Sequence, residues 1–188
     1  AYPQVRGLLM TREIQVGVRE LVSHVLRSGD LRQGFVGSRR ALDGLRGHQT
    51  VQGQRPDGYR AEVSLKHVHA AGDFSLHISG RVDGLLVTGA GVLIEEIKTT
   101  TSPLERLRLH QNPVHWGQVQ AYAYIYARQE RLAALTLRLT YYHLETEELL
   151  ELERRTSFAE LERFFNDVLD RYLQWARRLW NWLQRRDA

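Results

Sequence analysis

The chain has 188 residues, 43% of them hydrophobic and 26% charged, as is usual for a globular domain with a full core. It contains no cysteine, which excludes disulfides, thiolate nucleophiles, zinc–thiolate sites and iron–sulfur clusters held by cysteine. The formal net charge of +4 is compatible with a polyanionic partner but identifies none by itself.

Nothing in the sequence points to a membrane. No apolar run approaches the roughly 20 residues that a spanning helix needs, and the chain does not open on a basic and then apolar export signal. We therefore expect a cytoplasmic protein without a membrane partner. We also expect residues 1–188 to form a single domain, and the chain, which starts with Ala and ends in a helix-like segment, to be a fragment of a longer protein.

The first part of the chain predicts an arm and two helices. Residues 1–14 have no clear period and are expected to form an extended arm. Apolar residues at helical spacing predict helices over about 16–27 and 36–52. The second helix carries Gly44 and Gly47, which lower helix stability and often mark close packing or the approach of a ligand.

Three strands follow at about 59–69, 74–87 and 92–98. The connections between them are short enough for hairpins, so the three strands are expected to form an antiparallel meander. The third begins with a continuously apolar run, as is typical of a central strand.

The second half of the chain predicts helices and strands in alternation. A helix capped by Asn112 is expected over about 113–130, strands at about 135–144 and 149–155, and a long helix over 158–186. The order of helix, three strands, helix, two strands and helix predicts an α/β fold built around one mixed sheet.

Three polar residues on two adjacent predicted strands form the first candidate site. Asp83 lies in the second strand, while Glu96 and Lys98 lie two residues apart in the third and so share a face. Carboxylates on neighbouring strands can share magnesium or manganese, and a lysine beside them can orient or deprotonate a water molecule. Lys98 is one of only two lysines among 26 basic residues. The pattern indicates phosphodiester hydrolysis, with Glu95 on the opposite face as the weaker candidate.

The helices before and after the meander add further candidates. His48 lies one helical turn after Gly44, where it either packs or places an imidazole over the sheet, which would favour manganese or another transition metal. Gln118 and Tyr122 share a helix face and either pack or contact a phosphate or base near the metal.

Two other regions admit two readings each. Thr99, Thr100 and Thr101 either hydrogen-bond phosphates or belong to an ordinary loop. The helix over 158–186 is expected to cover the core with its apolar face. Its tryptophans exceed what one buried stripe needs, so part of it is a candidate surface for a partner domain or nucleic acid.

Four short motifs occur in order between about residues 40 and 145. They read Gly44-Leu-Arg-Gly-His48, Gly80-Arg-Val-Asp83, Glu96-Ile-Lys98 and Gln118-Val-Gln-Ala-Tyr122. This series resembles the G-x-x-x-H, G-x-x-D, E-x-K and Q-x-x-x-Y motifs of the RecB-like branch of the PD-(D/E)XK nuclease superfamily. The resemblance implies a restriction-endonuclease-like core: a central mixed sheet with an antiparallel three-strand meander, flanked by helices.

The resemblance also implies a metal site. His48, Asp83 and Glu96 would hold one or two Mn²⁺ or Mg²⁺ ions together with the backbone carbonyl of Ile97. Glu62 resembles an acidic position often present in the first strand, and we expect it to support the ligands rather than bind the ion. Many relatives carry an iron–sulfur cluster held by cysteines, which this chain cannot.

The remaining implied roles concern DNA. Lys98 would act on the attacking water, and Gln118 and Tyr122 would help to hold DNA, with Thr99 and Thr100 as candidate phosphate contacts. The implied function is a metal-dependent deoxyribonuclease, an exonuclease acting on single-stranded DNA in repair or processing.

The wording IEEIKTTT…NPVHWGQVQAYAYIYA resembles nuclease domains fused to bacterial DinG- or XPD-like helicases. We therefore expect a helicase partner in cis or in trans, although this sequence holds no helicase motif. The alternative function is a module that guides DNA to such a motor without cutting it. The basic charge favours that alternative, and the intact Asp, Glu and Lys set argues against it.

Overall fold

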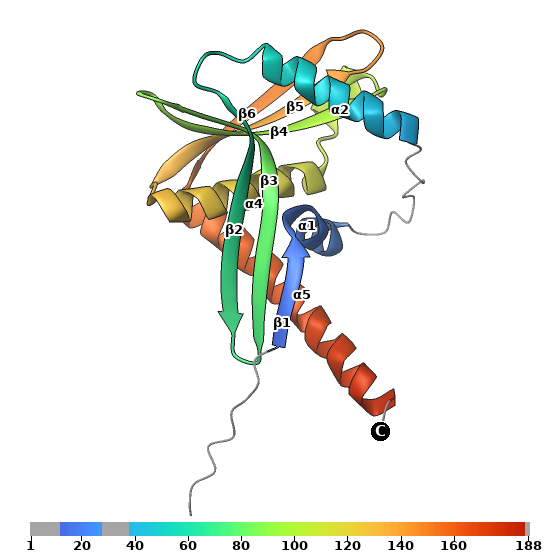
Figure 1. Ribbon diagram of the computed structural model, residues 1–188, viewed down its shortest axis with the longest axis vertical. Coiled ribbons are helices and arrows are strands. Elements are labelled where there is room, and N and C mark those ends of the chain that lie inside the picture. Colours follow the sequence, from blue (N-terminus) through green and yellow to red (C-terminus); the bar gives the residue numbers. More distant parts are fainter. Residues whose placement is uncertain (1–11, 28–37, 187–188) are drawn as a thin grey trace, which may run out of the picture.

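The computed structural model describes residues 12–27 and 38–186, which form six strands and five helices (Figure 1). The strands are β1 (Arg12–Gly17), β2 (Arg60–Ala71), β3 (Phe74–Thr88), β4 (Gly91–Thr100), β5 (Ala134–His143) and β6 (Leu149–Ser157). The helices are α1 (Val18–Leu26), α2 (Ser38–Gly53), α3 (Leu104–Leu109), α4 (Pro113–Glu130) and α5 (Phe158–Arg186).

All six strands belong to one mixed sheet. β2, β3 and β4 form the expected antiparallel meander, β5 lies parallel to β4, and β6 returns antiparallel to β5. The long C-terminal helix is present as well, so the α/β fold predicted from the sequence is confirmed.

The sequence did not predict β1. Residues 1–14 were expected to form an arm, of which 1–11 lie outside the described residues. Residues 12–17 instead form a strand that pairs in parallel with the first half of β3, from Phe74 to Ser79. The alternating burial along β1 is the pattern of a half-buried strand.

β1 and β4 share one edge of β3. β2 occupies the other edge almost along its length, while β1 pairs with β3 up to Ser79 and β4 pairs with it from Gly84 onward. In Figure 1, β1 and β4 accordingly lie beside different ends of β3. The interval from Gly80 to Asp83 has no strand partner on this edge, and the candidate site lies there.

The helices cover both faces of the sheet. α4 packs against β2, β4 and β5, and α1 and α5 cover its outer side, which explains why every residue of α4 from Trp116 to Ala127 is buried except Gln120. The Asn112 side chain caps α4 by accepting a 2.9 Å hydrogen bond from the N–H of Val114, as its position predicted. α2 lies on the opposite face, against β4 and β5.

α5 is amphipathic, as expected. Its inward side is buried over its first two thirds, with Leu161, Phe165, Leu169 and Leu173 in the core. Toward its end Leu179 and Trp182 are exposed. Among the described helices, none combines the length and the apolar character that crossing a bilayer requires.

Candidate metal centre

Asp83 sits where β3 and β4 part. The backbone register between the two strands begins at the pair Gly84–Glu95. Beyond that pair, Asp83 Oδ2 accepts a 2.7 Å hydrogen bond from the N–H of Ile97. The carboxylate thus replaces a backbone partner and fixes the two strands at the point where they separate.

His48 and Glu62 approach the same carboxylate from two other elements. Ligand atoms of His48, Glu62 and Asp83 lie within 4.8 Å of one another, and His48 Nδ1 is 3.4 Å from Asp83 Oδ1. Glu62 has a φ of 58°, a left-handed conformation that is uncommon for a residue other than glycine. An imidazole and carboxylates converging in this way can hold a divalent cation. Glu62 was expected only to support the ligands, but it lies within the group.

Gln52 links two members of this cluster. Its Nε2 donates to Glu62 Oε1 at 3.1 Å and to the backbone carbonyl of Asp83 at 3.0 Å. It was not singled out from the sequence, although it lies one helical turn after His48 and that spacing could have revealed it.

Glu96 is a fully buried carboxylate that lacks part of its hydrogen bonding. Its Oε1 accepts a 2.6 Å hydrogen bond from Lys98 Nζ, while its Oε2 has no hydrogen-bond partner among the residues that the structure describes. Burial raises the pKa of Glu96, a rise that the Lys98 ammonium opposes and the Asp83 carboxylate increases. A buried carboxylate oxygen without a donor is costly, and a cation would satisfy it. The donor set therefore fits a hard divalent ion.

Asp83 behaves differently. Burial alone would raise its pKa, but the hydrogen bond and charge of His48, followed by the N–H of Ile97, hold that pKa below its usual range. Asp83 is therefore anionic at neutral pH. A cation near Glu96 would favour the charged form of its carboxylate, which burial disfavours.

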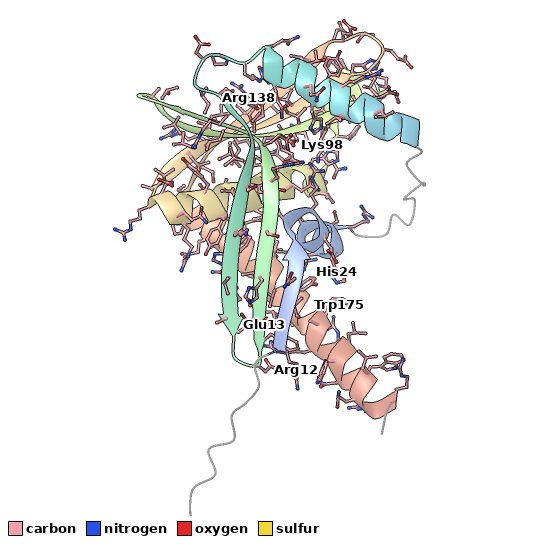
Figure 2. The ribbon with its side chains drawn as sticks, in the orientation of Figure 1. Arg12, Glu13, His24, Lys98, Arg138 and Trp175 are labelled. Atoms are coloured by element: carbon pink, nitrogen blue, oxygen red, sulfur yellow. The ribbon has the colours of Figure 1, made fainter. Side chains whose placement is uncertain are left out.

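Lys98 lies above α1 in the view of Figure 2, with its ammonium held between two acceptors. Nζ donates to Glu96 Oε1 and to Gln118 Oε1, each at 2.6 Å. Gln118 is buried, so its amide orients the lysine. Tyr122 is buried one turn further along α4, and burial raises its pKa. A Cβ at Gly80 would lie 2.7 Å from the Tyr122 hydroxyl, which explains a glycine there.

The glycines of α2 have different roles. A Cβ at Gly47 would lie 2.5 Å from Thr99 Cγ2, whereas one at Gly44 would be 3.6 Å from Thr99 Oγ1, an ordinary contact. Close packing therefore requires glycine at position 47. Thr99 faces α2, and the Thr100 hydroxyl accepts a hydrogen bond from the turn that follows β4. Neither threonine lines the cleft described below.

Arg19 is a site residue that the sequence did not reveal. It projects from α1, and its Nη2 lies 3.5 Å from Asp83 Oδ1 and 3.7 Å from Glu96 Oε1. The guanidinium thus lies between the two carboxylates. No local signal marks this residue, because the chain is rich in arginine and position 19 lies outside all four motifs.

These side chains border one cleft. Its volume is about 510 Å³, and residues of α1, α2, β2, β3 and α4 line it, including Arg19, His48, Glu62 and Asp83. The arrangement places His48, Glu62 and Asp83 at the wall of an open hollow. Glu96 and Lys98 are not among its lining residues but connect to it through Arg19, which contacts Glu96. A cation held here would be accessible to a substrate phosphate.

Comparisons with known proteins agree with this reading. The crystal structure of SSO0001 is similar, with a TM-score of 0.51 over 82% of this chain and 74% of that chain, and 18% sequence identity. This similarity supports the fold alone. No curated protein matches the chain significantly. The family model of the PD-(D/E)XK nuclease superfamily matches residues 15–187. The chain therefore belongs to the PD-(D/E)XK nuclease superfamily, whose members are metal-dependent nucleases.

Proposed function

We propose that this chain is a divalent-metal-dependent deoxyribonuclease that acts as an exonuclease on single-stranded DNA. The observation that carries the proposal is the buried Glu96 oxygen without a partner, close to the anionic Asp83 and the Lys98 ammonium. A group of this kind has no evident structural use, and it is complementary to a cation and a phosphate.

The metal would be manganese or magnesium. Asp83, Glu96, Glu62 and His48 would hold it, with the carbonyl of Ile97 as a further candidate ligand. When bound, such an ion lowers the pKa of water and offsets negative charge on the reacting phosphate. The imidazole of His48 favours manganese.

The chain's own residues would position the reacting groups. Lys98, fixed by Glu96 and Gln118, would orient the attacking water and offset charge on the phosphate. Gln118 would thus affect DNA cleavage through the lysine, while Tyr122 lines the cleft and would contact the strand. Thr99 and Thr100, which are partly exposed at the end of β4, would be further contacts for DNA phosphates.

The order of the motifs supports a RecB-like nuclease that processes or repairs DNA. We also propose that the given chain is a single nuclease domain, that it acts in the cytoplasm and that it works with a helicase in cis or in trans, as the wording of residues 94–127 suggests. The exposed Leu179 and Trp182 at the end of α5 are a candidate surface for that partner.

The test is digestion of labelled DNA in four forms, linear and circular, single- and double-stranded, with manganese or magnesium. Linear single strands should shorten while circles survive, and a chelator should stop the reaction. Lys98→Ala should remove cleavage without unfolding the protein. Lys66→Ala, which changes the other, exposed lysine of the chain, is the matched control. Full activity in Lys98→Ala, or activity with the chelator, would refute the proposal.

A second candidate function is a module that binds DNA without cutting it. The aromatic and basic residues at the end of α5, including the exposed Trp182, favour this function. Purified protein that binds single-stranded DNA but leaves every substrate intact with both metals would establish it instead.

A further inference from the structure

Arg19 contacts two of the carboxylates that would hold the candidate ion. Its guanidinium lies within 3.7 Å of both Asp83 Oδ1 and Glu96 Oε1. In the described part of the chain, Arg19 forms ion pairs with these two carboxylates. A divalent ion held by the same two carboxylates would be repelled by the guanidinium at such short distances. Metal and Arg19 therefore compete for Asp83 and Glu96.

Arg19 is placed so that it can leave. Its side chain is 55% exposed, unlike the buried carboxylates it contacts. It also lines a second hollow, formed with Glu20, Ser23 and His24 along α1, so there is open space next to the cleft. Because Asp83 and Glu96 are buried, leaving them without a cation would be costly, so the guanidinium can move away only as the ion replaces it.

Two features close to Arg19 favour an anion, while Glu20 in the first turn of α1 opposes one. α1 begins beside the cleft, at Val18, and its N-cap Gly17 provides no capping side chain for the free N–H groups. The positive end of the helix therefore faces the same hollow as the guanidinium. Arginine binds phosphate oxygens with two parallel hydrogen bonds, a geometry that suits a DNA backbone.

We propose that Arg19 is a placeholder cation that couples metal binding to DNA binding. Without DNA, its guanidinium neutralises Asp83 and Glu96 and weakens metal binding. When a DNA phosphate enters the cleft, Arg19 turns to it and releases both carboxylates to the ion. By linkage, DNA tightens metal binding and metal tightens DNA binding. This inference rests on the proposed nuclease function.

The test is calorimetric titration of Mn²⁺ into wild type and Arg19→Gln, with and without a single-stranded phosphorothioate oligonucleotide that resists cleavage. Without DNA, Arg19→Gln should bind Mn²⁺ about fivefold more tightly, because the guanidinium no longer competes for the two buried carboxylates. The oligonucleotide should tighten Mn²⁺ binding to wild type by a similar factor and leave Arg19→Gln nearly unchanged.

Cleavage should change in the opposite direction. Loss of a phosphate-binding guanidinium should lower kcat/KM of Arg19→Gln by about tenfold or more, although the metal binds more tightly. Arg163→Gln removes the same charge from an exposed position of α5 and should match wild type in both assays. Arg19→Lys, which keeps the charge but not the two-pronged geometry, should restore competition with Mn²⁺ but only part of the cleavage.

Equal Mn²⁺ affinity in wild type and Arg19→Gln without DNA would overturn the inference, and Arg19 would then be a static ion pair. An equal effect of the oligonucleotide on both proteins would overturn the coupling. Failure of the nuclease function is distinguishable, because wild type would then leave natural DNA intact with Mn²⁺ whatever the titrations show.

Discussion

Glu95 and Glu96 are consecutive in β4 and equally buried, but they have opposite surroundings. Glu95 lies on the face that α2 covers, and Arg55 and Tyr59 from the segment after α2 and Thr140 from β5 donate hydrogen bonds to both of its oxygens. Glu96 projects from the other face of β4, where Arg19 and Lys98 contact its Oε1, and no hydrogen bond within the described residues reaches its Oε2. The same residue type is therefore fully satisfied on one face of the strand and incomplete on the other.

The hydrogen bonds to Glu95 depend on close packing around Tyr59. The Tyr59 hydroxyl donates to Glu95 Oε2 at 2.7 Å, and burial and the glutamate charge raise the pKa of Tyr59. A Cβ at Gly84 would overlap the Tyr59 hydroxyl, so β3 must carry glycine there. Complete hydrogen-bond networks of this kind stabilise the core, whereas a buried polar atom that lacks a partner is a candidate ligand for an ion or substrate. Of these two consecutive residues, we therefore expect Glu95 to contribute mainly to stability and Glu96 mainly to function.

The largest expected difference between the faces is in catalysis. Glu96→Gln removes a charge from the candidate metal site and should lower kcat/KM by about a hundredfold or more. Tyr59→Phe removes one hydroxyl on the opposite face and should retain wild-type cleavage. A steady-state assay on labelled single-stranded DNA measures both. If the two variants lose activity equally, the division between the faces is wrong.

The next largest difference is in stability, where we expect the Glu95 side to matter more than the Glu96 side. Glu95→Gln leaves the buried Arg55 guanidinium with an incomplete set of partners and should lower the free energy of unfolding by about 3 kcal/mol. Glu96→Gln should stay within about 1 kcal/mol of wild type, because a neutral group replaces a buried carboxylate of raised pKa. Urea unfolding of both variants provides the comparison, and a reversed order would contradict it.

The cleft side of the sheet also has a pH-dependent group. His115 of α4 makes a 2.8 Å hydrogen bond with the Tyr141 hydroxyl, and burial followed by the charge of Lys98 lowers its pKa to about 4. The unfolded chain binds this proton near pH 6.5, so the contribution of His115 to stability is complete above that pH. It decreases as the pH falls from 6.5 toward 4, by up to about 3 kcal/mol.

Unfolding of wild type and His115→Gln across this pH range checks the prediction. Glutamine can keep a hydrogen bond to Tyr141 but does not titrate, so the variant should lose less stability on acidification. Parallel curves for the two proteins would show that His115 does not contribute to the pH dependence.

The smallest expected effect concerns the Tyr59 hydroxyl itself. Tyr59→Phe removes one of several hydrogen bonds to Glu95 and should lower the free energy of unfolding by about 1 kcal/mol. Thermal unfolding with and without Mn²⁺ measures it. A loss as large as that in Glu95→Gln would mean that the hydroxyl, rather than Arg55, is the main partner of the carboxylate.

The sequence was sufficient for features that depend on local spacing. The meander, the capping of α4 by Asn112 and the opposite directions of Glu95 and Glu96 follow from periodicity and cap chemistry. It was insufficient where distant segments meet. The parallel pairing of β1 and the position of Arg19 depend on how α1 and β1 dock beside β3, and no local pattern encodes that.

The same distinction applies within the candidate site. Asp83, His48 and Glu96 were singled out from motif spacing. In the structure His48 lies 3.4 Å from Asp83, and Arg19 contacts both Asp83 and Glu96. The left-handed backbone of Glu62 falls where the pairing of β2 with β3 skips Glu62 and Asp83, and Gln52 of α2 bonds to both of these residues. Such features depend on tertiary packing, which single-residue propensities do not describe.

The most direct test of the central claim is Mn²⁺ binding to wild type, Glu96→Gln and Tyr59→Phe, measured by calorimetry without DNA. If the incomplete carboxylate is a metal ligand, wild type and Tyr59→Phe should bind with the same affinity, and Glu96→Gln should bind at least about tenfold more weakly. Equal affinity in all three proteins would show that the unpartnered oxygen of Glu96 does not hold the ion, and would contradict the account.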